Sequence, residues 1–528
     1  LSTTQLAGIT SAQVGKLTTT ELSNLTSTQF AALSSTALAG LTSSQVKGIT
    51  TEAITALGTD QLNSIGTPAF IGITSSQVAN LTTTQVSGLS ETKIAGLSAT
   101  AVSGFTTTEI DALTTTQIGK LSAVQVGALG ADNLAQFSTT NLALLTAAQL
   151  TGVTSSQVSA LSSTQVGALS STQLNSLTTL ALKSLTADQA AAISSTELSG
   201  LAVTRIGALT TSAVRALTTT ALTGLTSTQA IGLTASQVTN LTTDQVAALS
   251  TDQLNKLTVA AVGGLNATLA EALTTTQISG LANTVLGALT TGAVAALDET
   301  QIGSLTAGQV PALKAAQLNA LTSTALGGLE TTDVAALTTA QISGISSTQV
   351  GNLTSTQFAT LLSTQLAALT TASIGVLDET KLGALDTTQL AGLGAIQVAA
   401  LTSTAFAGLN TTQLGGLTTA QLGAFTASAI GALTSTSVLA LTTIQVQGFS
   451  TAAIASISTT QFGDIATTLL GELSATQLKS VTATNLNSLE TTAIAALDTT
   501  LLAGLAVNQI AGLNATSIGA LTTTQASG

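Results

Sequence analysis

Residues 81–88 read LTTTQVSG, and the rest of the chain repeats this eight-residue pattern with small changes. The pattern is in phase at residues 1–8, LSTTQLAG, and again at residues 521–528, LTTTQASG. The 528 residues divide into 66 octads with no remainder and no insertion. We therefore expect one continuous octapeptide array over residues 1–528, without an internal domain boundary.

Large side chains are confined to two positions of the octad. Position 1 is Leu almost throughout, position 6 is mostly Val, Ile or Leu, and all nine Phe residues occupy one of these two positions. Position 2 is mostly Thr or Ser, position 5 mostly Gln, and positions 7 and 8 mostly Ala, Gly or Ser. Positions 1 and 6 are therefore predicted to form the core.

Neither a continuous helix nor a continuous strand suits this spacing. Eight helical residues advance about 800°, so position 1 would drift around the helix by about 80° per octad and form no stripe. In a strand, positions 1 and 6 would face opposite sides, because they are an odd number of residues apart. The chain must bend in every octad, which predicts a solenoid.

The order of residues within the octad favours an α-solenoid. Thr or Ser at position 2 is a helix N-cap residue, and Gln or Glu three residues later completes a capping box. Positions 1 and 6 then occupy the two sites of a hydrophobic staple. In residues 81–88 these roles fall to Thr82 and Gln85 for the box, and to Leu81 and Val86 for the staple. Gly or Ala at position 8 also suits a helix end.

The placement of charged residues within the octad agrees with the direction of the predicted helix. Of 23 acidic residues, 19 lie at positions 2 to 5, and the others are Asp111, Glu271, Asp464 and Glu472. Seven of the 11 basic residues lie at positions 7 and 8. A helix dipole favours acid at its start and base at its end. We therefore predict an all-α solenoid of 66 units, each one short capped helix plus a corner.

A β-solenoid with Thr-rich strands, two or three octads per coil, stays open as the alternative. Thr, Val and Ile favour strands, and single helical turns are unstable alone. Pro311 at position 7 also fits poorly inside a helix.

Composition excludes several classes of function. The formal charge of −12 argues against nucleic acid and against an anionic membrane surface. Polar positions interrupt every apolar run, so no segment reaches the roughly 20 residues that a spanning helix needs. His and Cys are absent, which removes the imidazole base, the thiolate and the soft metal ligands. We expect no enzyme, no cofactor, no metal and no catalytic residue.

Few residues could carry chemistry. The pairs Asp298–Glu299 and Asp378–Glu379 could be metal ligands or an acid–base pair, but an Asp cap followed by a Glu in the first turn is the favoured interpretation. Arg205 and Arg215 could meet on neighbouring units, and solvated cations are the favoured interpretation. Gln at position 5 is interpreted as a capping-box partner, as part of an amide ladder between coils, or as both.

Octads of the LTTTQVSG type over the whole chain resemble the Thr/Ser/Gln/Ala-rich repeat tracts of giant secreted bacterial surface proteins. These adhesin-like and filament proteins use such tracts as a stalk or filament body. The matching residues are Leu at position 1, Thr-Thr-Thr-Gln at positions 2 to 5, and Val, Ile or Leu followed by Ala or Gly. The resemblance implies an extracellular or cell-surface location.

The expected function is a structural extracellular repeat protein, forming a stalk or a self-assembling filament by end-to-end association. The alternative is a surface-binding module that contacts ice or glycan through ordered Thr arrays. Ser and Thr hydroxyls are also candidates for glycan attachment. The triplets at Asn24 and Asn266 match the N-glycosylation pattern, but the repeat itself generates them. Without an initiator Met, the chain is interpreted as mature, processed or excised from something longer.

Overall fold

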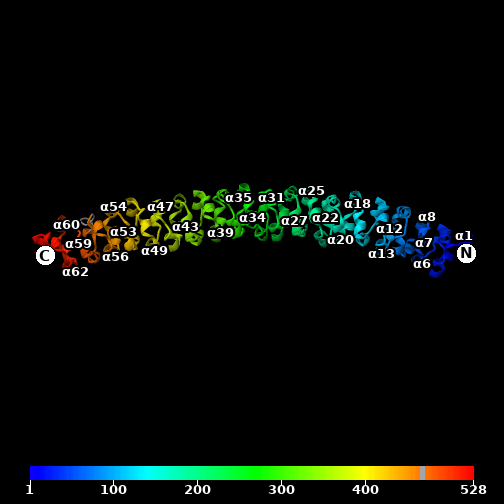
Figure 1. The fold of residues 1–528 in the computed structure, drawn as a ribbon, viewed down its shortest axis with the longest axis horizontal. Coiled ribbons are helices and arrows are strands. Elements are labelled where there is room, and N and C mark those ends of the chain that lie inside the picture. Colours follow the sequence, from blue (N-terminus) through cyan, green and yellow to red (C-terminus); the bar gives the residue numbers. More distant parts are fainter. Residues whose placement is uncertain (464–469, 528) are drawn as a thin grey trace. The chain divides into compact units, whose positions relative to one another are not determined.

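The computed structural model describes residues 1–463 and 470–527. The chain forms two compact units, residues 1–265 and residues 266–528, and each is considered by itself. In both units the described residues form short helices and no strands (Figure 1). The all-α solenoid is thus confirmed, and the β-solenoid alternative is wrong for the described residues. Asp464 lies outside them.

Each α-helix in the described residues begins at position 3 of its octad and ends at position 6, 7 or 8. The helices therefore contain four to six residues, as in α10 (Ser75–Val78), α14 (Thr107–Asp111) and α11 (Thr83–Gly88). The same start applies in unit 2, for example in α44 (Ser355–Phe358). None of the helices in the described part of the chain is long and apolar enough to cross a membrane.

The predicted capping box forms at α11. Thr82 has extended backbone angles, and its Oγ1 accepts a hydrogen bond from the Gln85 main-chain N–H at 3.2 Å. The Thr82 main-chain N–H in turn donates to Gln85 Oε1 at 2.8 Å. Leu81 and Val86 are buried on either side of the cap, as a hydrophobic staple requires. The sequence pattern therefore predicted the local structure correctly.

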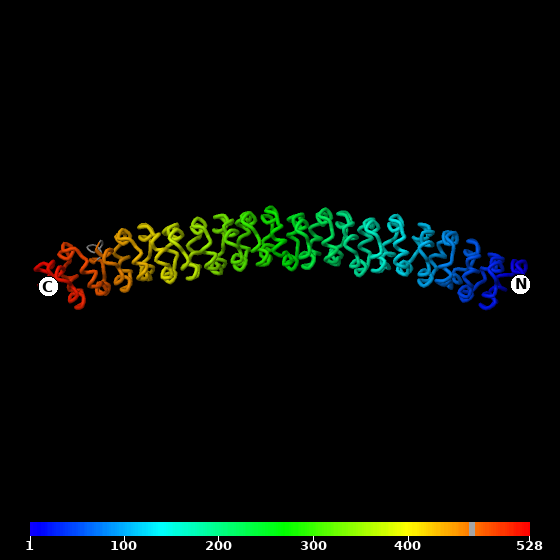
Figure 2. Tube along the Cα trace, in the orientation of Figure 1, coloured from blue at the N-terminus to red at the C-terminus, as the bar shows by residue number. Residues whose placement is uncertain are grey.

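Three octads make one coil of the solenoid. Helices pack against the helix three places away along the chain, so α11 contacts α8 (Thr59–Ser64) and α14, and α44 contacts α41 (Thr331–Ala335). Figure 2 shows the trace of each unit winding in successive coils of this kind. Side chains at positions 1 and 6 are buried inside the coils and form the core.

Glycine at position 8 lies at a helix end, as predicted. The structural reason for glycine there is the close approach of the neighbouring coil, and not the termination of the helix. No described residue has a positive φ, so these glycines do not use left-handed backbone. A Cβ added to Gly40 would lie 2.1 Å from the main-chain oxygen of Ser11, which is in the preceding coil. The absence of a side chain at position 8 therefore permits close contact between coils.

Pro311 changes its octad. Residues Val310–Ala312 form a 3₁₀ helix, η1, where neighbouring octads form α-helices. Proline has no N–H to donate to the carbonyl four residues earlier, so an α-helix through position 7 cannot complete its last turn. A second 3₁₀ helix, η2, spans Leu470–Glu472.

Candidate functional site

The most repeated polar contact of the molecule is made by the glutamine at position 5. In α11 the Gln85 side chain is 4% exposed. Its Nε2 donates to the main-chain oxygen of Leu57 at 2.7 Å and to that of Ile54 at 3.1 Å, which lie 28 and 31 residues earlier. Because Oε1 of the same amide accepts the cap N–H, one side chain joins its own helix start to the preceding coil.

The same contact recurs in both units. Gln45 donates to residues 14 and 17, Gln301 to residues 270 and 273, and Gln421 to residues 390 and 393. In contrast, the main-chain to main-chain hydrogen bonds outside the helices join residues only three or four apart within the described residues. Polar cohesion between coils therefore depends on side chains.

The two interpretations of position 5 thus hold together. Glutamine is the capping-box partner through Oε1 and the link between coils through Nε2. The link differs in one respect from the expected amide ladder, because the acceptor is a main-chain carbonyl and not another side-chain amide.

Ionised residues replace this glutamine in a few octads. Lys93 is buried, its Nζ donates to the Ile65 carbonyl 28 residues earlier, and it lies 5.4 Å from the centre of the Phe70 ring. Burial lowers the pKa of Lys93. Lys381 instead forms an ion pair with Asp378 at 3.3 Å. Lysine therefore supplies a donor but no acceptor for the cap.

Asparagine at position 7 makes a second contact between coils, which the sequence analysis missed. Asn63 donates through Nδ2 to the Gly88 carbonyl at 2.7 Å, and its Oδ1 accepts the Ser90 N–H at 2.8 Å. Ser90 is the cap residue of an octad in which position 5 is Lys93. The Lys93 side chain has no acceptor for the Ser90 N–H, and Asn63 provides one instead. The same pairing links Asn175 to Ala202, in the octad of Arg205, and Asn487 to Asn514, in the octad of Ser517. Asn319 makes the same contact with Ser346 at 2.7 Å, although position 5 of that octad is a glutamine, Gln349. The detectable signal was therefore an asparagine at position 7, 27 residues before a cap residue.

In the pairs Asp298–Glu299 and Asp378–Glu379, the aspartate is the N-cap residue of a helix. Asp298 accepts the Gln301 N–H at 2.7 Å, and Asp378 accepts the Lys381 N–H at 2.8 Å. These hydrogen bonds lower the pKa of Asp378, first through the main-chain N–H and then through the Lys381 ammonium, while partial burial opposes them. Glu299 and Glu379 each occupy the first turn of the helix that follows. The pairs are thus placed as helix caps.

The two arginines bind separate groups. Arg205 donates to Thr179 Oγ1 at 3.3 Å, and Arg215 donates to the Asn240 carbonyl at 3.4 Å. Asn24 lies at the end of α3 (Thr19–Ser23), whereas Asn266 caps α34 (Ala267–Glu271) by accepting the Leu269 N–H.

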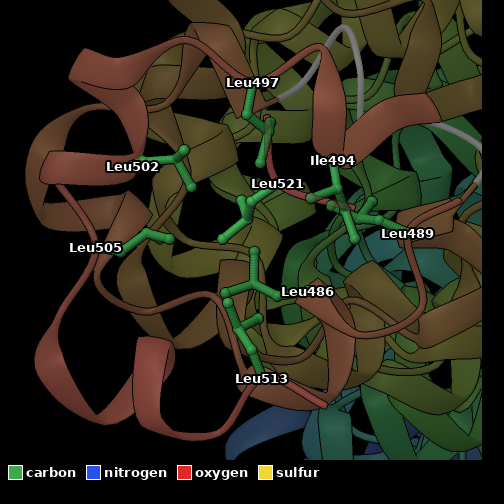
Figure 3. A pocket seen from close by; sticks show the side chains of 8 residues that line it. All are labelled: Leu486, Leu489, Ile494, Leu497, Leu502, Leu505, Leu513 and Leu521. Atoms are coloured by element: carbon green, nitrogen blue, oxygen red, sulfur yellow. The ribbon is translucent and has the colours of Figure 1, made fainter. Parts of the chain in front are cut away.

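Cavities in the described residues are small or open. An apolar pocket in the last coils, shown in Figure 3, holds only about 10 Å³. It is lined by Leu486, Leu489, Ile494, Leu497, Leu502, Leu505, Leu513 and Leu521. The larger hollows, such as one of about 430 Å³ beside Glu330 and Thr354, are shallow depressions between helices. No group of three or more acidic residues is placed to hold a metal ion in the described part of the chain.

Comparison with known proteins supports a repeat protein. A family model described as the ALTTAQ repeat matches residues 326–363. No curated protein matches the chain. A solved structure described as "Structure of APUM23-GGAAUUGACGG" is 12% identical, with 98% of this chain and 96% of that chain covered, but its TM-score of 0.13 supports no inference about this chain.

Proposed function

We propose that this chain is a structural repeat protein that serves as a stalk or filament body on the cell surface or outside the cell. The observation that carries the proposal is the glutamine contact, which joins coil to coil by the same hydrogen bonds in both units. Cohesion is therefore distributed along the array and depends on no single residue. The resemblance to repeat tracts of secreted surface proteins supports the location.

Self-association is proposed to use this same contact between molecules. Gln29 donates to the Leu1 carbonyl, whereas Gln5 and Gln13 have no such acceptor in the described residues. In the last octads Ile510 and Ile518, at position 6, are 44% and 53% exposed, although position 6 is buried in the inner coils. A further coil of the same chain or of another molecule would satisfy these groups, and for these 528 residues on their own we propose that another molecule supplies it.

Electron microscopy and light scattering of the purified 528-residue chain test the proposal. We expect particles that elongate with rising protein concentration. Two double variants, each altered at one end of the array, identify the interface. The first, Gln5→Glu with Gln13→Glu, removes the amide donors. The second, Ile510→Glu with Ile518→Glu, places charge on the exposed apolar surface. Each variant alone should remain a monomer, and an equimolar mixture should form one-to-one pairs, because each retains one intact surface. Particles that stay monomeric at every concentration would contradict self-association.

Sugar attachment to Ser and Thr is a further part of the proposal. Positions 3 and 4 carry hydroxyls outside the caps, such as the exposed Thr83 and Thr84. Mass spectrometry of protein purified from its natural source should show hexose-type mass additions on such residues; unmodified peptides throughout would contradict it. The ice- or glycan-contacting alternative required a flat β face, and no observation in the described residues favours it.

A further inference from the structure

We propose that a buried acid, Asp333, makes its coil contact sensitive to acid: it gains the missing hydrogen bond to the preceding coil when it takes up a proton. The inference concerns the contact between coils and does not depend on self-association. Asp333 occupies position 5, where glutamine makes the link elsewhere, and it is 2% exposed.

The ionised acid reproduces only half of the glutamine contact. Asp333 Oδ2 accepts the Glu330 N–H at 3.0 Å. A carboxylate has no hydrogen to donate, so the Leu305 carbonyl, 28 residues earlier, lacks the donor that Gln85 gives to Leu57.

A protonated acid can supply the missing donor. Carboxylic acids are close in shape to the matching amides, and they donate through O–H. Aspartic acid matches Asn485, which donates to the Ile457 carbonyl 28 residues earlier at 2.8 Å. Asn133 makes the same bond to Phe105 at 2.5 Å, so a side chain of this length reaches the preceding coil.

The surrounding charges support proton uptake at Asp333. Burial is the main cause that raises its pKa, and the Glu330 carboxylate adds to it, while the Glu330 N–H opposes them. α41 packs against α44, which carries no ionisable residue. The octad that contains η1 carries none either, and α38 (Glu299–Gly303) and its cap carry only Asp298 and Glu299. Lys314, the cap of the following octad's helix α39 (Ala315–Ala320), is the nearest cation along the chain.

The direction of the pH effect follows from these contacts. A proton taken up by the folded state and released on opening stabilises the closed contact in acid, and this stabilisation is lost as the pH rises through the raised pKa of Asp333. We therefore expect the Asp333 contact to be closed more firmly in acid, opposite to the effect of acid on carboxylate caps such as Asp378, whose pKa is lowered.

Hydrogen–deuterium exchange with mass spectrometry tests the proposal on the full chain. Protection of the peptide that contains Leu305 is measured between about pH 8 and pH 4, relative to the peptide that contains Leu57. We expect this ratio to rise about tenfold in acid, the worth of one hydrogen bond. Asp333→Asn should hold the high ratio at every pH, and Asp244→Asn, at an exposed position, should leave the wild-type profile unchanged.

The outcomes separate clearly. A flat ratio in the wild-type chain overturns the proposal, as does a pH response that persists in Asp333→Asn. Circular dichroism of each variant confirms that it is folded before exchange is measured.

Discussion

At the residue scale, one amide does two tasks. Gln85 closes the cap of α11 through Oε1 and reaches the preceding coil through Nε2. Both tasks require an acceptor and a donor on the same planar group, and the side-chain amide of glutamine provides both at neutral pH. Polar residues at position 5 are therefore under a stricter chemical requirement than the exposed hydroxyls at positions 3 and 4.

Replacing Gln85 by alanine should weaken this contact. The change removes the cap acceptor and leaves the Leu57 and Ile54 carbonyls without the amide donor, so we expect a loss of about 2 kcal/mol in the local opening free energy. Amide exchange of the peptides around residues 54–57 and 82–86 measures it. Thr83→Ala, at an exposed neighbour, should change those rates little; equal effects of the two variants would contradict the assigned role.

Two adjacent glycines offer a matched test of coil spacing. A Cβ at Gly328 would lie 2.3 Å from the Glu299 main-chain oxygen, whereas one at Gly327 would meet nothing within 4 Å. We expect Gly328→Ala to destabilise the contact by about 1–3 kcal/mol, and Gly327→Ala to be neutral or to stabilise α40 (Ser323–Gly327) by up to about 1 kcal/mol. Thermal unfolding of both variants gives the comparison, and the reverse order would exclude close approach as the reason for glycine.

At the element scale, each helix is too short to persist alone. Helices of four to six residues are far below the length at which isolated peptides are helical, so caps and packing must stabilise them. The cap at position 2 fixes where each helix begins, and the buried side chains at positions 1 and 6 hold it against the coil. An octad is therefore expected to be helical only when it is packed against neighbouring octads.

The cap makes a separable contribution. Thr82→Ala should cost about 1 kcal/mol of local stability, because the Gln85 N–H loses its side-chain acceptor. Exchange of the first amides of α11 reports the change. Thr84→Ala serves as the control, since Thr84 is exposed and alanine favours the helix interior. A similar loss of local stability in both variants would contradict a specific contribution of the cap.

Local structure could be predicted from the octad, whereas contacts between coils could not. Thr82 and Gln85 lie three residues apart, so the capping box is visible in the sequence. The partners Leu57 and Ile54 become visible only once the number of octads per coil is known, and the octad itself does not determine it. Asn63 and Ser90 were missed for the same reason, since their contact spans 27 residues. Gly40 was assigned to a helix end because its neighbour Ser11 is distant in sequence.

At the scale of the whole molecule, stability should depend on the number of coils. Within each unit, the helix contacts of the described residues join adjacent coils, so each unit resembles a one-dimensional chain of coupled coils. Arrays shortened by whole coils of three octads should unfold at progressively lower denaturant concentrations, with the largest drop in the shortest arrays. Far-ultraviolet circular dichroism follows the transitions. An unfolding midpoint that is independent of length would contradict nearest-neighbour cohesion.

The octad register also has a consequence for inheritance. Beyond the first coil, position-5 glutamines such as Gln85 and Gln421 bind carbonyls at fixed octad positions, so the contact depends on position within the octad and not on the identity of a particular copy. A deletion or duplication of whole octads brings equivalent residues to the same places and restores the contacts on both sides of the change. The gain or loss of whole octads can therefore alter the length of the array without a structural intermediate, whereas the gain or loss of a single codon shifts every later residue out of register.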